Sequence, residues 1–404
     1  MERQPLRRNV SLIWLFRIVM ALQFWMPISV IYLQSRGLTL TQIGLLESVG
    51  GLTIMLAEVP TGAVADLFGR RVSLTLGMLI MTLGLGLYAI ADSFWLVAFS
   101  YIPWMIGYTL TSGADSALLY DSMKAIGEEQ RYATIEGRNN TWEQGASAVA
   151  VASGGWLAIK FGLSIPIWLT LAVTALGAVL CLGLVEAPVQ RTGKRSSGVA
   201  GQVRVAVSIL FKQRILFLLM LFSALTAGMA FILKQSFFQV YAKAIDLPIT
   251  LFGVLSFTMV LAGMAGSAFS GRLRTSGRRL GLLVPACLMG VAFLGLGIAR
   301  NLTGISLLLI IPFLSSLLRP ALLAAINQGV ESEVRATVLS VNSLLWSVVL
   351  AVVSPVAGWL ADRSLQSAFG TMGLTMLLVA PFIWWLVQPK RSLASVAQVA
   401  NPPQ

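Results

Sequence analysis

The stretch EVPTGAVADLFGRRVSL, residues 58–74, joins two long apolar runs through a short charged turn. The run that precedes the turn, 41–65, is long enough to cross a bilayer, which takes roughly 20 apolar residues. The run that follows it, 72–90, is nearly free of polar groups. A tight basic connection between two spanning helices is expected in the cytoplasm, and every other segment can be placed from this turn.

Residues of this turn stand at fixed offsets that suit a loop packed against its neighbours: Gly62, Ala65, Asp66, Gly69, Arg70 and Arg71. Glycine permits close backbone approach and an abrupt change of direction, and Asp66 can meet the positive end of a neighbouring helix. The pattern resembles the loop between transmembrane helices 2 and 3 of the major facilitator superfamily. The resemblance implies an inner-gate loop, in which Asp66 caps the eleventh span near Thr337 and Arg70 or Arg71 reaches Asp121.

The composition is that of a membrane protein, with 57% hydrophobic and 11% charged residues and a mean hydropathy of +0.82. The sequence predicts an all-α fold of twelve transmembrane helices. The predicted spans are 10–33, 41–65, 72–90, 94–118, 138–159, 165–184, 215–241, 248–269, 281–299, 305–328, 338–360 and 368–387. Nothing in this pattern predicts a soluble protein or an enzyme, because long exposed loops of the kind that usually carry catalysis are not predicted.

The 29 Lys and Arg residues predict the orientation. With both termini in the cytoplasm, most of them lie on the cytoplasmic side, and the basic residues outside are Arg36, Lys160, Lys243, Arg300 and Arg363. The net charge of +13 therefore indicates topology and no nucleic-acid partner. Cys181 and Cys287 fall inside spans and the chain has no histidine, so we expect neither a disulfide nor a metal or cofactor site.

The chain also predicts two halves of similar design. We expect a six-helix bundle over 1–186, a basic cytoplasmic linker over 187–213, a second bundle over 214–388 and a cytoplasmic tail over 389–404. Gly69-Arg70-Arg71 recurs at 277–279, and the alignment of the two copies sets Arg274 opposite Asp66. Two pseudo-symmetric six-helix bundles are the architecture of the superfamily that the loop resembles.

Eight ionisable residues fall inside the predicted spans: Arg17, Glu47, Glu58, Asp115, Arg138, Glu143, Lys234 and Arg319. Charges in hydrocarbon are costly and usually face a cavity or a partner, so these are candidates for proton coupling or for the substrate cavity. The third, sixth, ninth and twelfth spans carry no charge, and the resemblance places them on the outside of the bundles. At about 1.5 Å per residue, Arg17 and Glu58 lie at similar depths and could meet.

A second repeat sets two opposite charges at equivalent positions. Matching 117–119 to 321–323 sets Asp115 opposite Arg319, which predicts an ion pair that closes the inner side when the carrier faces outward. The alternative is that each residue bonds within its own half, Arg319 to carbonyl groups freed by Pro320. Aromatic residues that could line the cavity are Trp25, Trp104, Trp142, Phe237, Phe238 and Trp346.

The leading hypothesis is a secondary transporter that moves a small organic molecule outward by proton antiport, as a monomer in the inner membrane of a bacterium. The alternatives are a metabolite importer or facilitator and a sensor that does not transport. Gly154-Gly155 matches a glycine pair of proton-driven exporters in the fifth span, but Ala150-Val151 stands where those exporters carry Gly-Pro. The fourth span has Pro103 where an arginine is common in that group, which weakens the antiport assignment.

Overall fold

The computed structural model describes residues 3–188, 214–273, 280–328 and 335–387, and this part of the chain is helical without strands. The first half consists of α1 (Arg3–Ala21), η1 (Met26–Ile28), α2 (Ser29–Ser35), α3 (Leu40–Phe68), α4 (Arg70–Ile90), α5 (Phe94–Thr111), α6 (Ala114–Ala125), η2 (Glu129–Arg131), α7 (Tyr132–Phe161) and α8 (Ile165–Leu182). The second half consists of α10 (Arg214–Ile232), η3 (Leu233–Phe237), α11 (Phe238–Ala244), η4 (Ile249–Leu251), α12 (Phe252–Leu273), α13 (Leu280–Ile298), α14 (Thr303–Gln328), α15 (Arg335–Arg363) and α16 (Leu365–Val387).

In the described residues, ten helical segments are long and apolar enough to cross a membrane. The other two of the twelve predicted passages are α7, whose polar residues lower its hydropathy, and the passage made by α5 with α6. The span predicted over 94–118 is divided between two helices, because Gly113 takes a left-handed conformation (φ 78°) and starts a new helix. The linker predicted over 187–213 and the repeat at 277–279 lie almost wholly outside the described residues.

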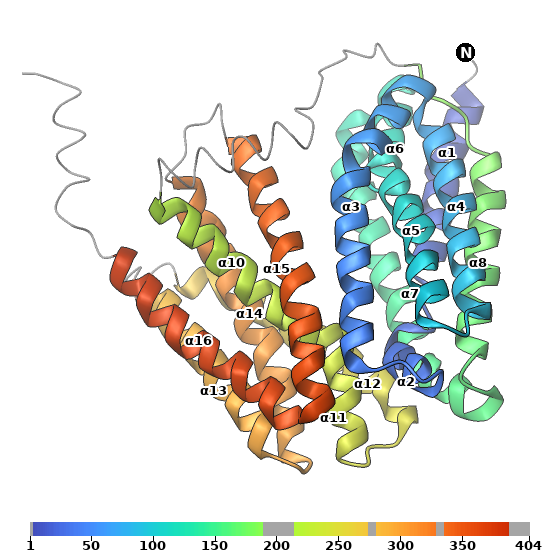
Figure 1. The fold of residues 1–404 in the computed structure, drawn as a ribbon. Helices are drawn as coiled ribbons and strands as arrows, with labels where there is room; N and C mark the ends of the chain where they lie inside the picture. Colours follow the sequence, from blue (N-terminus) through green and yellow to red (C-terminus); the bar gives the residue numbers. More distant parts are fainter. Residues whose placement is uncertain (1–2, 189–213, 274–279, 329–334, 388–404) are drawn as a thin grey trace, which may run out of the picture.

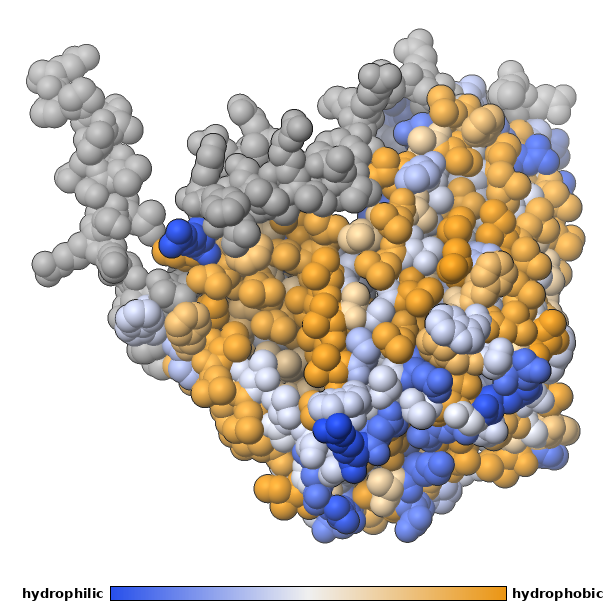
Figure 2. Space-filling view, viewed as in Figure 1, coloured by the Kyte–Doolittle hydropathy of each residue, from blue (hydrophilic) through white to orange (hydrophobic). Residues whose placement is uncertain are grey.

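The helices form two bundles, and the helices that contain the charge-free predicted spans lie at the outer edges. Figure 1 shows α4 and α8 at the far right and α13 and α16 at the far left, and each pair packs together. These are the spans that the sequence predicts to face lipid. The space-filling view agrees, since apolar residues cover both flanks and hydrophilic residues gather at the lower end of the molecule (Figure 2).

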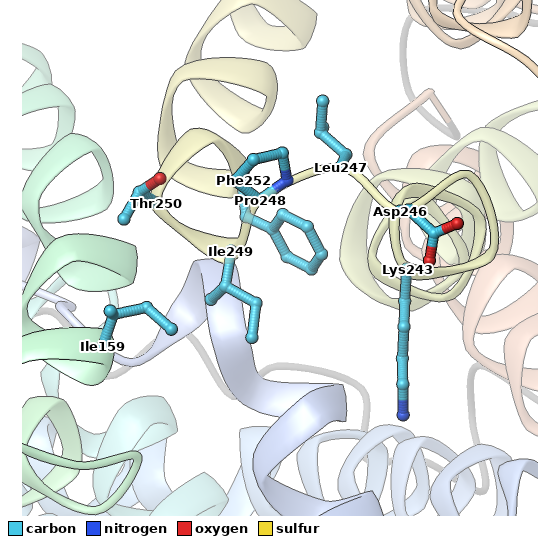
Figure 3. Close-up of a pocket in the computed structure, with 8 residues that line it drawn as sticks. All are labelled: Ile159, Lys243, Asp246, Leu247, Pro248, Ile249, Thr250 and Phe252. Atoms are coloured by element: carbon cyan, nitrogen blue, oxygen red, sulfur yellow. The ribbon is translucent and has the colours of Figure 1, made fainter.

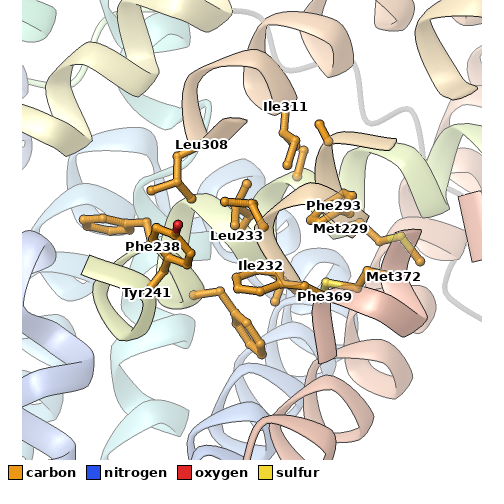
Figure 4. Close-up of a cluster of buried hydrophobic side chains, with 14 of the residues drawn as sticks. Met229, Ile232, Leu233, Phe238, Tyr241, Phe293, Leu308, Ile311, Phe369 and Met372 are labelled. Atoms are coloured by element: carbon orange, nitrogen blue, oxygen red, sulfur yellow. The ribbon is translucent and has the colours of Figure 1, made fainter. Parts of the chain in front are cut away.

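The second bundle has an apolar core built around aromatic rings. Phe369 of α16 contacts Phe237, Tyr241 and Phe293, with ring centroids 5.9, 6.0 and 6.5 Å away. Figure 4 shows Phe369, Tyr241 and Phe293 converging with Met229 from neighbouring helices. Phe237 and Phe238, two of the candidates for the cavity wall, pack in this core instead, because they are only 3% and 1% exposed.

The two bundles meet along α3 and α15 at the lower end of Figure 1. A Cβ atom added to Gly44 of α3 would overlap the Ser354 backbone of α15, so the two helices touch through their main chains. The Ser48 hydroxyl donates to the Ala351 carbonyl at 2.6 Å. At the upper end the helices diverge, and Leu67 and Phe68 at the end of α3 are 72% and 66% exposed. The molecule is thus closed at the end where α3 begins and splayed where α3 ends.

Candidate functional site

The loop between α3 and α4 is fixed by a carboxylate that the sequence prediction missed. Gly69 bridges the two helices at φ 108°, a conformation that favours glycine. The backbone amides of Arg70 and Arg71 donate to the two Glu186 carboxylate oxygens, each at 2.9 Å. Glu186 thereby binds the positive start of α4, where helix amides lack partners. A side chain at position 69 would overlap this carboxylate, which is a second reason, besides the φ angle, for glycine at this position.

The arginine side chains of the loop bind within the first half. Arg70 forms an ion pair with Asp121 of α6 and also donates to the Ala117 carbonyl at 2.9 Å. Arg71 donates to the Leu182 carbonyl at 3.0 Å, at the end of α8. The expected contact between Arg70 and Asp121 is therefore present, and it joins the loop to the end of the fourth passage.

The other half of the expected gate involves Asp66 at the end of α3. Asp66 and Gly62 lie at the end of α3 and are exposed. The side chain of Thr337, near which Asp66 was expected to cap the eleventh span, lies outside the described residues. The gating role of this loop stays a prediction.

Among the described residues of the first half, the most buried charge is Arg17 of α1, at 5% exposure. Its Nε donates to Asp115 at 2.7 Å, its Nη1 lies 3.0 Å from Glu136, and its Nη2 donates to the Ser116 hydroxyl at 2.7 Å. Asp115 and Ser116 are in the first turn of α6, which exists because the chain breaks at Gly113. One guanidinium is thus held by carboxylates from two other helices.

This arrangement corrects the predicted pair of Arg17 and Glu58. Glu58 is exposed on α3, whereas the Arg17 donors are occupied by α6 and α7. Glu136 was missed because the fifth span was predicted to begin at 138, while α7 begins at Tyr132 and brings Glu136 into the helix. The signal was available as helical spacing, since positions 136, 139 and 143 are polar and share one face of a helix.

Further polar atoms of α1 and α7 are buried without a hydrogen-bond partner in the described part of the chain. They are the side-chain amide of Asn139, Oε2 of Glu136 and Nε1 of Trp14. Asn139 is 1% exposed. Buried polar groups are normally hydrogen-bonded, and a buried water molecule is the usual partner of such atoms. We call Arg17, Asp115, Ser116, Glu136 and Asn139 the α1–α7 polar cluster.

The remaining predicted charges fall into two groups. Glu47 and Glu143 are half-buried, and Arg138, Lys234 and Arg319 are exposed. In this state Asp115 bonds Arg17 within its own half, as the alternative interpretation expected of it. The pair of Asp115 with Arg319 was predicted for a carrier that faces outward and stays a prediction.

Several aromatic rings pack together inside the first bundle. Trp25 and Trp104 lie 4.9 Å apart between centroids, Trp104 lies 5.3 Å from Tyr101, and Tyr88 lies 5.4 Å from Trp25. The Tyr88 hydroxyl is buried without a partner among the described residues. Trp25 and Trp104 thus belong to the packing of this bundle. Elsewhere, Trp142 contacts Trp14 edge-on and Trp346 contacts Phe231.

A pocket of about 400 Å³ lies at the lower end between the two halves. Its residues come from the end of α7 and from the segment that joins α11 to α12: Ile159, Lys243, Asp246, Leu247, Pro248, Ile249, Thr250 and Phe252 (Figure 3). The α1–α7 polar cluster contributes no residue to this pocket. Among the described residues, no group of three His, Cys, Asp or Glu side chains could hold a metal ion.

Comparisons with known proteins agree with this architecture. The chain is 25% identical to a multi-drug resistance efflux pump PmrA homolog of Lactococcus lactis, over 96% of both chains. It is 23% identical to the MFS-type transporter MJ1560 of Methanocaldococcus jannaschii, over 43% of this chain and only 45% of that protein.

Solved structures show the same fold at low sequence identity. The nucleoside transporter NupG matches with a TM-score of 0.76 and 14% identity, over 96% of this chain and 100% of that chain. A bacterial homolog of the lysosomal transporter Spinster, in an inward-facing conformation, matches with a TM-score of 0.70 and 15% identity, over 95% and 96% of the chains. The model of the Major Facilitator Superfamily matches residues 13–348. The chain therefore belongs to the Major Facilitator Superfamily of membrane transporters.

Proposed function

We propose that this transporter exports a small organic molecule in exchange for protons, by alternating access. The observation that carries the proposal is that the two halves are joined at one end and splayed at the other, while a polar cluster is buried inside the first half. A molecule that binds between the halves could reach one side only in this state. We assign the splayed end to the cytoplasm, because the basic loops and both termini are expected there.

Proton coupling is supported by the balance of charge around Arg17. Two carboxylates, Asp115 and Glu136, bind one guanidinium, and Glu143 follows Glu136 two turns later on the same face of α7. A carboxylate that is partly removed from water can bind a proton in one state and release it in another when its surroundings change. Since the chain has no histidine, carboxylates are the groups available for such coupling.

The direction of transport rests on a weaker comparison. Export is supported by the name of the Lactococcus lactis relative, an efflux pump homolog. Import is the second candidate, because the similar structures include a D-xylose-proton symporter, with 12% identity and a TM-score of 0.65. We also propose the division into bundles at 1–186 and 214–388, the linker between them, the monomeric state and the location in a bacterial inner membrane.

Transport in proteoliposomes tests the proposal. A pH gradient imposed across the membrane is expected to drive a fluorescent cationic dye against its concentration gradient, and the sign of the movement reports antiport or symport. Glu143→Gln and Glu58→Gln test two of the carboxylates that the sequence offers for coupling: a variant at the coupling site should still exchange dye between equal compartments but lose gradient-driven accumulation. Glu129→Gln, at an exposed position of η2, is the matched control. Uphill transport by both single variants would remove these two residues from the mechanism.

A further inference from the structure

Asp362, at the end of α15, binds the first turn of α3 in the opposite half. Its Oδ1 accepts the backbone N–H of Leu40 at 2.7 Å. Its Oδ2 accepts the backbone N–H and the hydroxyl of Thr41 at 2.8 and 2.6 Å. One carboxylate thus joins the two halves by three hydrogen bonds at the end that is closed.

The chemistry of a helix start explains why a carboxylate serves here. The first amides of a helix have no partner inside it and carry partial positive charge. In α3 the Thr39 hydroxyl accepts the Gln42 amide, which leaves the amides of Leu40 and Thr41 for another acceptor. Asp362 supplies that acceptor together with a full negative charge, and charge-assisted hydrogen bonds are stronger than neutral ones.

Glycine at position 358 makes this contact possible. A Cβ atom added to Gly358 would overlap the Leu40 carbonyl, so a larger side chain would separate the end of α15 from the start of α3. Gly44 meets the Ser354 backbone in the same way one helical turn along. The two helices therefore fit closely over the segment that Asp362 joins.

A similar sequence occurs at the end of α7, with Ile159 in the place of Asp362. Residues 155–160 read GWLAIK and residues 358–363 read GWLADR. Gly155 meets the Ile249 carbonyl at the start of η4, as Gly358 meets α3. Lys160 lies over Trp156 at 4.9 Å, and Arg363 lies over Trp359 at 3.6 Å. The closed end thus has two similar contacts, and only the one that ends in Asp362 includes a carboxylate.

The end of α3 repeats part of this pattern at the splayed end. Residues 62–66 read GAVAD and residues 358–362 read GWLAD, so each helix of the pair ends in Gly-x-x-Ala-Asp. Gly358 is in contact with the opposite half, whereas a Cβ atom added to Gly62 meets nothing within 4 Å in the described part of the chain. In this state, the α3–α15 pair is therefore in contact at the Gly358 end and separated at the Gly62 end.

We propose that Asp362 is an outer latch, a positioning residue for transport that holds the outer side closed by capping α3 while the inner side is open. When the carrier opens outward, Asp362 leaves α3, and the Gly62–Asp66 end closes on the start of α15. The inference rests on the proposed alternating access. It adds the residue that stabilises the state opposite to the one assigned to the inner-gate loop.

Distances between spin labels test the latch in the full chain, with both natural cysteines replaced by alanine. One label pair, at Ser35 and Ser306, spans the outer end. The second pair, at Gln130 and Ser267, spans the inner end. Asp362→Asn removes the charge and one carboxylate oxygen, so we expect the ratio of outward-open to inward-open molecules to rise about tenfold. The outer distance then lengthens and the inner one shortens, a change that a local loss of stability would not produce.

Matched variants at the other end complete the test. Asp66→Asn should shift the same ratio the opposite way, and the steric pair Gly358→Leu and Gly62→Leu should reproduce the two directions without a change of charge. If Asp66→Asn and Gly62→Leu shift the distances but Asp362→Asn and Gly358→Leu do not, the outer latch is wrong. If no variant produces a second set of distances, and neither does a pH gradient, alternating access itself is refuted.

Discussion

Replacement of Arg17 by glutamine is the perturbation with the clearest expected cost. Arg17 is 5% exposed, and the side chains of Asp115 and Glu136 are 16% and 21% exposed. Glutamine cannot supply the positive charge or reach three acceptors at once. The variant therefore leaves two carboxylates without the guanidinium charge, and the Ser116 hydroxyl, which donates to Glu136 at 3.3 Å, cannot replace that charge.

The size of the effect follows from burial. Removing one partner of a buried ion pair costs about 3–5 kcal/mol, because the remaining charge stays desolvated. Both carboxylates keep some contact with solvent, so we expect Arg17→Gln to lower the free energy of unfolding by about 3 kcal/mol, at the low end of that range. Arg17→Gln combined with Asp115→Asn should recover part of this loss, since the second change removes one uncompensated charge.

Unfolding in mixed micelles, titrated with a denaturing detergent and followed by tryptophan fluorescence, measures these differences. Arg7→Gln is the control, because Arg7 also pairs with a glutamate, Glu128, but is 66% exposed. Exposed pairs contribute about 0–1 kcal/mol, so this variant should unfold nearly as the parent does. If Arg17→Gln is no less stable than Arg7→Gln, or if the double variant is less stable than Arg17→Gln alone, the cluster is not held together as described.

Two other predictions concern packing and gating. Gly84→Leu should destabilise the first bundle by forcing α4 away from the Trp104 backbone of α5. Gly86→Leu should not, because a Cβ atom added there meets nothing within 4 Å in the described residues. Thermal unfolding of the two variants compares them directly. Asp115→Arg and Arg319→Asp should each impair transport in proteoliposomes, and the double variant should recover a substantial part of it if the two residues pair when the carrier faces outward. A double variant no better than the worse single one would exclude that pair.

Local features of the sequence predicted the architecture. The thickness of the bilayer determines how long an apolar run must be to cross it, so each passage could be placed without knowing its neighbours. The absence of charge from the predicted spans 72–90, 165–184, 281–299 and 368–387, which lie in α4, α8, α13 and α16, predicted their outer positions, because a charge that faces lipid is costly. The contact between Arg70 and Asp121 followed from a motif of known spacing. Each of these inferences depends on residues close together in the chain or on a recognised pattern.

Partner choice inside the bundles depended on the tertiary structure. Arg17 pairs with Asp115 and Glu136, which lie about a hundred residues away in the sequence. Asp115 is within reach because the chain breaks at Gly113 and α6 starts there, and Glu136 is within reach because α7 begins earlier than its hydropathy indicates. Glu186 and Asp362 each bind the start of a helix that lies far away in sequence. Hydropathy shows that a segment crosses the membrane. It does not show which of several carboxylates at similar depth is the partner of a given arginine or helix start. Only the packing of the helices, which fixes their rotation and their close approach at glycine, decides which of those carboxylates meets which donor.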